Sequence, residues 1–307
     1  MKAAVFGKTG LELREVDRPQ PKSGEVLVRV RYAGLNRRDL TRARGDEGVI
    51  PGMDWSGEIE GSGERVMCMG ERGYAEFAAV DRERCLPVPA GIDFEQAATL
   101  PLALLTMHDA LVTNGALKKG ESVLILGASS GVGLMGLQIA KLSGAGFVAG
   151  TSRRGASRDK LKAFGADLAL DTASPAWVDE LLAATGGKGV DLVIDQVSGK
   201  LFNQTQQATA IGGRIVNVGR LGGMVAEVDF NQHALRRLRY IGVTFRTRSP
   251  GEVREVVRRA RADLWPALEA GRLRLPVDRV FPLAEAEAAQ QRMRADEHFG
   301  KILLRVG

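Results

Sequence analysis

The chain has 307 residues, 44% of them apolar and 26% charged, a composition typical of a soluble globular protein with room for about two domains. It lacks an apolar run of the roughly 18 residues that a membrane span needs, and its two cysteines exclude a disulfide framework. The net charge of +6 is scattered among acidic residues and forms no basic stripe with interleaved aromatics. We therefore expect a cytoplasmic protein without a membrane anchor, and nucleic acid is not favoured as a partner.

The first part of the chain favours β-structure. The N-terminal stretch from Met1 to Phe6 turns polar too early for a secretory signal, and we predict that it forms the first strand. Short apolar runs such as residues 26–30 and 76–80 follow, separated by Gly, Pro and Asp. A mainly β domain is predicted to about Pro89.

Residues 123–245 alternate between short strands and helical segments. Strands are predicted at residues 123–126, 147–149, 167–170, 192–195, 214–218 and 240–245. Such alternation is typical of an α/β fold with a doubly wound parallel sheet and helices on both faces.

The end of the chain returns to helix and strand in short pieces. After Pro250 we predict a helix to about Ala270, a strand at 279–283, a helix at 284–294 and a strand at 301–306. Because these elements are too short for a separate domain, we expect them to rejoin the first one. The predicted domains are then residues 1–108 with 252–307, and residues 109–251.

A glycine-rich loop follows the strand at 123–126. The GxGxxG spacing of its glycines allows a tight turn, close approach of a pyrophosphate and close helix packing, and the helix start offers N–H groups to phosphates. We predict that a dinucleotide binds at Ser130, Gly131, Val132, Gly133 and Gly136. The alternative is a structural turn that binds nothing.

The end of the second strand of this domain indicates which dinucleotide binds. An NAD site usually carries Asp or Glu there, roughly 20 residues after the first glycine, to bind the ribose hydroxyl. This chain has Ser152, Arg153 and Arg154 instead. Guanidinium groups can pair with a 2′-phosphate, which favours NADPH. The alternative is that both arginines are solvated loop residues.

The glycine-rich loop and residues 152–154, together with sequence landmarks in the rest of the chain, resemble the zinc-free quinone oxidoreductase branch (zeta-crystallin-like) of the medium-chain dehydrogenase/reductase superfamily. The likeness covers nearly the whole chain. The resemblance implies a Rossmann domain and a GroES-like, mainly β catalytic domain that the C-terminus completes. Its other landmarks are residues 24–30, 34–39, 51–57, 63–66, 73–77 and 298–304.

Zinc-dependent members of the superfamily hold a catalytic metal at positions that match Asn36, Met53 with Asp54, and Leu102. These side chains do not make a zinc site, so we expect no metal. Without a Lewis acid the hydride acceptor must already be electrophilic, and the resemblance implies NADPH-dependent reduction of quinones or other conjugated carbonyls. A reductase of acryloyl-type thioesters or enals is the enzymatic alternative. A regulatory or nucleic-acid-binding protein that binds NADPH is the non-enzymatic one.

The resemblance also assigns single residues. Asn36 and Thr106 become catalytic candidates, although Asn36 also suits a role in loop structure. His108 and His298 lack an evident partner in the sequence and are read as structural. Further cofactor-binding candidates, which also suit packing or solvated charge, are Asn217, Val218, Gly219, Phe245, Arg246 and Lys301.

Two further expectations concern substrate and assembly. The stretch at residues 40–50 is shorter than in the family and lacks its usual Tyr, which leaves the substrate open. The strand that begins at Tyr240 and runs to Phe245 ends the predicted sheet, and an apolar edge strand needs covering. We therefore expect a homodimer joined through this strand, as in relatives.

Overall fold

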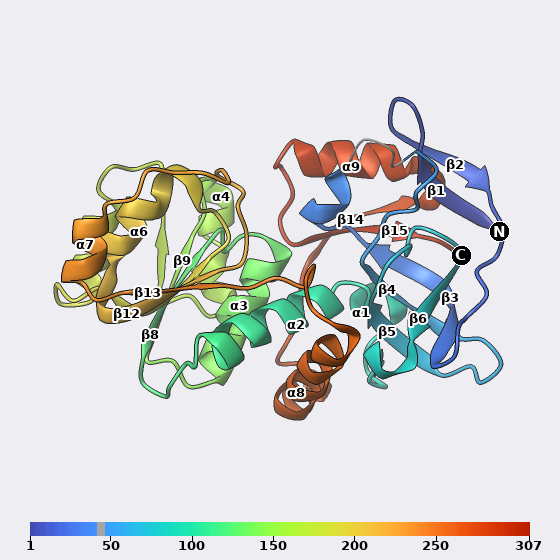
Figure 1. Ribbon diagram of the computed structural model, residues 1–307, viewed down its shortest axis with the longest axis horizontal. Helices are drawn as coiled ribbons and strands as arrows, with labels where there is room; N and C mark the ends of the chain where they lie inside the picture. Colours follow the sequence, from blue (N-terminus) through green and yellow to red (C-terminus); the bar gives the residue numbers. More distant parts are fainter. Residues whose placement is uncertain (42–46) are drawn as a thin grey trace. The chain divides into compact units, whose positions relative to one another are not determined.

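The computed structural model describes residues 1–41 and 47–307, and its contacts divide the chain into two compact units (Figure 1). The first unit comprises Met1–Leu102 and Pro250–Gly307, and the second comprises Ala103–Ser249. In the described part of the chain, every helix is too short or too polar to cross a membrane.

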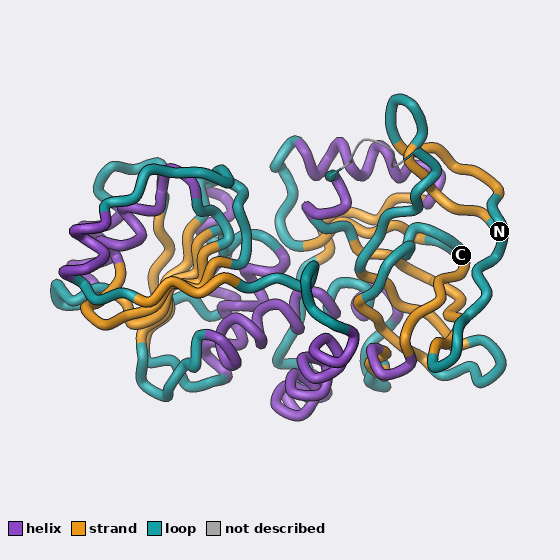
Figure 2. Tube along the Cα trace, viewed as in Figure 1, coloured by secondary structure: helices purple, strands orange, loops and turns teal. Residues whose placement is uncertain are grey.

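The first unit is built on a mainly antiparallel sheet of seven strands (Figure 2). Its order is β14-β15-β3-β4-β5-β7, and β6 pairs with β3. The C-terminal strand β15 pairs with β3, so the end of the chain lies in the sheet of the first unit. The strands are β3 (Glu25–Gly34), β4 (Asp54–Ile59), β5 (Arg65–Met69), β6 (Phe77–Asp81), β7 (Cys85–Pro87), β14 (Val277–Pro282) and β15 (Lys301–Arg305).

A separate antiparallel pair, β1 (Lys2–Phe6) and β2 (Leu11–Glu15), confirms the predicted first strand. The long helix α8 (Pro250–Glu269) buries one apolar stripe, which includes Val253, Val257 and Leu264, because residues three or four apart share a helix face. The remaining helices are α1 (Phe94–Ala97), α9 (Ala286–Arg294) and the 3-10 helices η1 (Arg37–Leu40), η2 (Arg82–Arg84) and η6 (Leu283–Glu285).

The second unit contains the parallel sheet that the sequence predicted, in the order β10-β9-β8-β11-β12-β13. Leu124 and Leu126 of β8 face the core that holds Trp177 of α5. Ile125, which points the other way, lies against α3 at Gly136. Both faces of the sheet are therefore covered, which explains the uninterrupted apolar run of β8. The strands are β8 (Ser122–Leu126), β9 (Phe147–Thr151), β10 (Leu168–Leu170), β11 (Val190–Asp195), β12 (Thr209–Asn217) and β13 (Arg239–Gly242).

The edge strand β13 ends at Gly242, short of the predicted Phe245. After it the chain turns, and the Arg248 side chain donates to the Thr244 carbonyl at 3.0 Å. The apolar residues that extended the prediction thus belong to a loop.

The helices of this unit are α2 (Pro101–His108), which starts in the first unit, the π-helix η3 (Asp109–Asn114), α3 (Gly131–Leu142), α4 (Gly155–Arg158), α5 (Trp177–Ala184), α6 (Phe202–Ala208), α7 (Phe230–Leu235), and the 3-10 helices η4 (Leu161–Phe164) and η5 (Gly199–Leu201).

Candidate functional site

The glycine-rich loop lies where β8 ends and α3 begins. Gly127 turns the chain with a φ of +75°. Ser130 caps α3: its hydroxyl accepts from the Gly133 N–H at 3.0 Å and donates to the Gly127 carbonyl at 2.9 Å. The Ser130 side chain thus fixes the helix start at the carboxyl edge of the sheet, where doubly wound folds bind ligands.

The two later glycines of the motif are required by close packing. A Cβ at Gly133 would lie 2.5 Å from the Gly127 carbonyl oxygen, and one at Gly136 would lie 2.8 Å from Ile125 Cδ1. The same Cβ at Gly136 would meet Met107 Sδ at 2.9 Å. The predicted catalytic candidate Thr106 is the half-buried neighbour of Met107 on α2. The motif therefore forms a cradle that a larger residue would fill.

The end of β9 lies beside this cradle. Thr151 Oγ1 accepts from the Gly127 N–H at 3.0 Å, and the Ser152 and Ser129 hydroxyls are 3.0 Å apart. Arg153 and Arg154, the predicted phosphate-binding pair, are exposed. The structure thus brings the predicted arginine loop next to the predicted glycine loop.

Arg158 is a residue that sequence reasoning missed. It donates to the Ser152 carbonyl at 3.0 Å and pairs with Asp171 at 2.7 Å. Its position one helical turn after Arg154, on the short helix α4, was the available signal. Arg158 supports the loop that carries Arg153 and Arg154.

The predicted residues Asn217, Val218 and Gly219 lie at the carboxyl end of β12. The Asn217 amide donates to Ser198 Oγ at 2.5 Å, and the Ser198 hydroxyl lies 2.9 Å from the Gly219 carbonyl. The Val218 N–H donates to the Asp195 carbonyl at 2.8 Å. The ends of β11 and β12 are therefore joined by one buried network.

Asp195 stands at the centre of that network. Its carboxylate accepts from the N–H groups of Val197 and Ser198, both at 2.8 Å. Burial raises the pKa of Asp195, and these hydrogen bonds oppose the rise. Its role is to hold the turn after β11, where Ser198 adopts a φ of 57°.

Gln196 joins the glycine loop to the Asn217 loop, and sequence reasoning missed it as well. Its amide donates to the Leu126 carbonyl at 3.1 Å, and its Oε1 lies 3.4 Å from the Ser130 hydroxyl. A Cβ at Gly219 would lie 2.6 Å from the Gln196 carbonyl oxygen. Its place directly after a predicted strand, at the same edge as the glycine loop, was the available signal.

Phe245 and Arg246 lie on the loop that follows β13. Phe245 is half-buried and Arg246 exposed. The Arg248 guanidinium stands 5.5 Å from the Phe245 ring centroid and pairs with Asp109 at 2.6 Å. The Val243 N–H donates to the Asn217 carbonyl at 3.1 Å, so this loop leaves the sheet beside the Asn217 network.

The first unit holds a buried polar network around Asn36 and Lys301. The Lys301 ammonium donates to Asp54 Oδ2 at 2.8 Å and to Asn36 Oδ1 at 2.9 Å. The Asn36 amide donates to Asp54 Oδ2 at 3.0 Å, and Asp54 Oδ1 accepts from the Leu102 N–H at 2.7 Å. Asn36 and Asp54, two of the residues compared above with zinc ligands, are therefore joined by an ammonium group, and Leu102 is linked to them only through its N–H on Asp54.

Asp39 extends this network and was not predicted. Its Oδ2 accepts from the Asn36 N–H at 2.9 Å and from the Tyr74 hydroxyl at 3.1 Å. Burial raises the pKa of Asp39 to about 6, although both donors and the nearby Lys301 charge lower it. The spacing of Asn36 and Asp39 at the start of η1 was the available signal.

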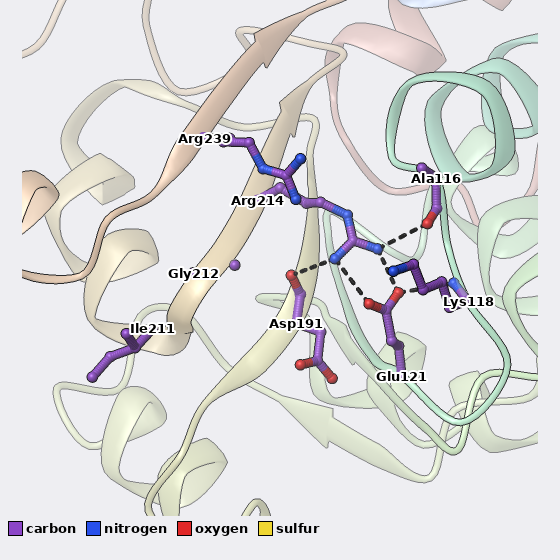
Figure 3. A pocket seen from close by; sticks show the side chains of 9 residues that line it. Ala116, Lys118, Glu121, Asp191, Ile211, Gly212, Arg214 and Arg239 are labelled. Atoms are coloured by element: carbon purple, nitrogen blue, oxygen red, sulfur yellow. Dashed lines mark hydrogen bonds and ion pairs between the residues drawn. The ribbon is translucent and has the colours of Figure 1, made fainter.

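Residues 42–46, within the stretch expected to border the substrate, lie outside the described residues. A pocket of about 330 Å³ lies instead at the amino edge of the parallel sheet, opposite the glycine loop (Figure 3). There Arg214 donates hydrogen bonds to Glu121 and to the Ala116 carbonyl, each at 3.1 Å. The Glu121 carboxylate therefore neutralises the Arg214 charge. None of the predicted site residues is among those that line this pocket.

Two protein families match the chain. The family described as "Zinc-binding dehydrogenase" matches residues 131–262, and the "Alcohol dehydrogenase GroES-like domain" matches residues 22–90. Among solved structures, the quinone oxidoreductase from Thermus thermophilus, described with its NADPH complex, is 32% identical. Each chain is covered completely, with a TM-score of 0.87.

Curated relatives fall into two kinds. The quinone oxidoreductase of Rattus norvegicus is 28% identical and is matched over 93% of this chain and 90% of its own. A phenolphthiocerol/phthiocerol polyketide synthase of Mycobacterium tuberculosis is also 28% identical, over 96% of this chain. The chain spans only 14% of that synthase.

Proposed function

The chain belongs to the quinone oxidoreductase branch of the medium-chain dehydrogenase/reductase superfamily, and we propose that it is an NADPH-dependent reductase of quinones or other conjugated carbonyl compounds. The observation that carries the proposal is the cradle at Ser130, Gly133 and Gly136 with the arginine loop beside it. When bound, NADPH would supply the hydride. The protein would supply binding and orientation.

The arginine loop supports NADPH over NADH. The residue pair Arg153 and Arg154 is exposed at the end of β9, and Ser152 stands where an NAD site has a carboxylate. The 2′-phosphate of NADPH would therefore meet positive charge, with a hydroxyl at position 152 in place of a repelling carboxylate. The backbone from Ser130 to Gly133 would hold the pyrophosphate at the start of α3, and Gln196 would keep the neighbouring loop in place.

Removal of either arginine tests the cofactor. Each charge-assisted contact contributes about 1.5 to 3 kcal/mol, so Arg153→Ala or Arg154→Ala should weaken NADPH binding by roughly tenfold to a hundredfold. NADH affinity should change little. Lys162→Ala, which removes another exposed positive charge of this unit, is the control. The measurement is the dissociation constant of each cofactor at fixed ionic strength. Equal losses of affinity for NADPH and NADH would contradict the proposal.

We infer a conjugated acceptor because we propose that hydride transfer here proceeds without a metal. An α,β-unsaturated carbonyl or a quinone is electrophilic without a Lewis acid, whereas a simple alcohol or ketone gains from one. Asn36, Thr106, Phe245 and Arg246 remain proposed contacts of substrate or cofactor. The measurement is kcat/KM for NADPH oxidation with quinones, enals and simple ketones. A preference for simple ketones would contradict the inference.

A second candidate is reduction of an acryloyl-type thioester. The match of 96% of this chain to a polyketide synthase favours it, and the net charge of +6 would attract an acidic carrier. The same kinetic panel, extended to enoyl thioesters of coenzyme A and of a carrier protein, separates the two candidates. Higher kcat/KM for the thioesters would select the second.

We propose that two chains associate through β13. The strand lies at the sheet edge with Tyr240 48% exposed, and Met224, Val225 and Phe230 in the preceding segment are more than 70% exposed. Bare edges and apolar patches favour association. Light scattering at micromolar concentration should give twice the chain mass of 33.0 kDa. A monomer would overturn this assembly.

A further inference from the structure

Three neighbouring strands place a lysine against a carboxylate inside the first unit. Lys301 is the first residue of β15, Gly34 the last of β3 and Asp54 the first of β4. A Cβ at Gly34 would lie 3.2 Å from both Lys301 Cε and Asp54 Cβ. The lysine side chain therefore crosses over the bare Cα of Gly34 to reach Asp54.

The resulting ion pair is almost fully buried. The side chain of Lys301 is 3% exposed and that of Asp54 is 0% exposed. Burial of charge is costly, and even a well-bonded pair seldom stabilises a fold more than apolar residues of the same size would. Its presence here suggests a role beyond stability.

The donor atoms around this pair do not fit a zinc ion, although the matching family is described as zinc-binding dehydrogenase. Asp54 Oδ2 and Asn36 Oδ1 accept from the ammonium, and Leu102 contributes an N–H donor to Asp54 Oδ1. A divalent cation at these oxygens would have to share them with the positive charge of Lys301. Coulomb repulsion at such distances is strong in a buried site.

We propose that the Lys301 ammonium takes the place of the catalytic metal in this chain. It is the fixed cation of the site: it neutralises Asp54, orients the Asn36 amide and excludes a divalent ion. Lys301 is thus a positioning residue that acts through Asn36. This role in reduction rests on the proposed function, whereas exclusion of metal does not.

Cobalt(II) added alone tests the exclusion directly. The variant Asn36→Cys/Leu102→Cys supplies two thiolates beside Asp54 and keeps the ammonium, and a triple variant adds Lys301→Met. Thiolate-to-cobalt absorption should report binding by the triple variant at least about a hundredfold tighter than by the double variant. The wild type should show no such band.

Equal cobalt affinity of the double and triple variants would overturn the exclusion. Circular dichroism and a cooperative urea transition check that each variant is folded. If the triple variant does not fold, Asn36→Cys/Lys301→Met, compared with Asn36→Cys, repeats the test with one thiolate fewer. The same hundredfold difference is expected, and its absence overturns the proposal. None of these measurements requires turnover.

A second experiment tests the positioning role. Lys301→Met/Asp54→Asn removes both charges and keeps an acceptor for the Leu102 N–H, so the fold should survive. We expect kcat with the best substrate of the panel to fall at least tenfold while NADPH affinity stays within about twofold. Wild-type kcat in this variant would reduce Lys301 to a structural counterion. Loss of the proposed function itself would appear instead as absence of NADPH oxidation by the wild type.

Discussion

The two units arrange their polar groups in opposite ways. In the second unit, the ends of parallel strands present backbone groups and small side chains, with Arg153 and Arg154 exposed beside them. In the first unit, Lys301, Asp54 and Asn36 satisfy one another inside the fold. The binding loop of the second unit is visible in the sequence as a local spacing of glycines. The buried network of the first unit instead joins residues up to 265 positions apart. The comparison teaches that a local motif reveals a binding loop more readily than a buried charge network.

The largest effect on stability should come from removing one partner of the buried ion pair between Lys301 and Asp54. Asp54→Leu leaves the Lys301 ammonium buried without its carboxylate, which should cost about 3 to 5 kcal/mol in the free energy of unfolding. Glu58→Gln on the same strand breaks the half-exposed pair with Arg31 and should cost less than about 1 kcal/mol. Urea denaturation measures both. Similar costs for the two variants would mean that the buried network carries no special weight.

Asp39 should make the first unit sensitive to pH. Its pKa of about 6 in the folded chain exceeds the ordinary 3.8, so between these values the folded state holds a proton that the unfolded state has released. The free energy of unfolding should therefore fall as pH rises through this window, by about 3 kcal/mol in total. Asp39→Asn should remove this slope.

Denaturation curves of wild type and Asp39→Asn at several pH values between 4 and 7.5 measure the difference. Asp17→Asn, which removes an exposed carboxyl group, is the control and should keep the wild-type slope. Parallel curves for wild type and Asp39→Asn would show that Asp39 does not titrate in this window.

A change in the cradle of the second unit should weaken both folding and cofactor binding. Gly133→Ala places a Cβ 2.5 Å from the Gly127 carbonyl oxygen, so the loop must shift at a cost of about 1 to 3 kcal/mol. NADPH affinity should fall at least tenfold because the loop and the start of α3 move apart. Gly242→Ala, with open space around its Cα, is the matched control. Unchanged NADPH affinity in Gly133→Ala would remove this loop from the proposed site.

The fold followed closely from local patterns. The central strands β8 and β11 of the second unit are buried on both faces, so they appear in the sequence as short apolar runs, and the glycine spacing after residue 126 located the loop. The strand at Tyr240 was overextended because the apolar Val243 and Phe245 follow it in a loop. The π-helix η3 was not foreseen, since its residues have the same apolar pattern as an α-helix.

The site was less accessible to sequence reasoning. Asp54 entered only as a poor zinc ligand, and Lys301 only as a cofactor contact implied by the resemblance. Their contact depends on the pairing of β15 with β3 and of β3 with β4, which no local pattern contains. Gln196 and Ser198 were missed for a related reason: their partners, Leu126 and Asn217, lie at the ends of other strands of the same sheet.

The smallest expected effect concerns Ser198, where strain and hydrogen bonding oppose each other. Its φ of 57° and ψ of −149° lie in a region that favours glycine, at a cost of about 1 to 3 kcal/mol for other residues. Its hydroxyl also forms hydrogen bonds with the Asn217 amide and the Gly219 carbonyl, and each such bond contributes about 0.5 to 1.5 kcal/mol.

Ser198→Gly releases the strain and loses the bonds, so its stability should stay within about 1 kcal/mol of wild type. Ser198→Ala loses the bonds and keeps the strain, and should be less stable than Ser198→Gly by about 1 kcal/mol or more. Both should weaken NADPH binding to a similar extent, because the Asn217 loop loses its anchor in each. Urea denaturation measures the stability of both variants, and NADPH titration measures their affinity for the cofactor. An alanine variant as stable as the glycine variant would mean that the backbone at Ser198 carries no strain.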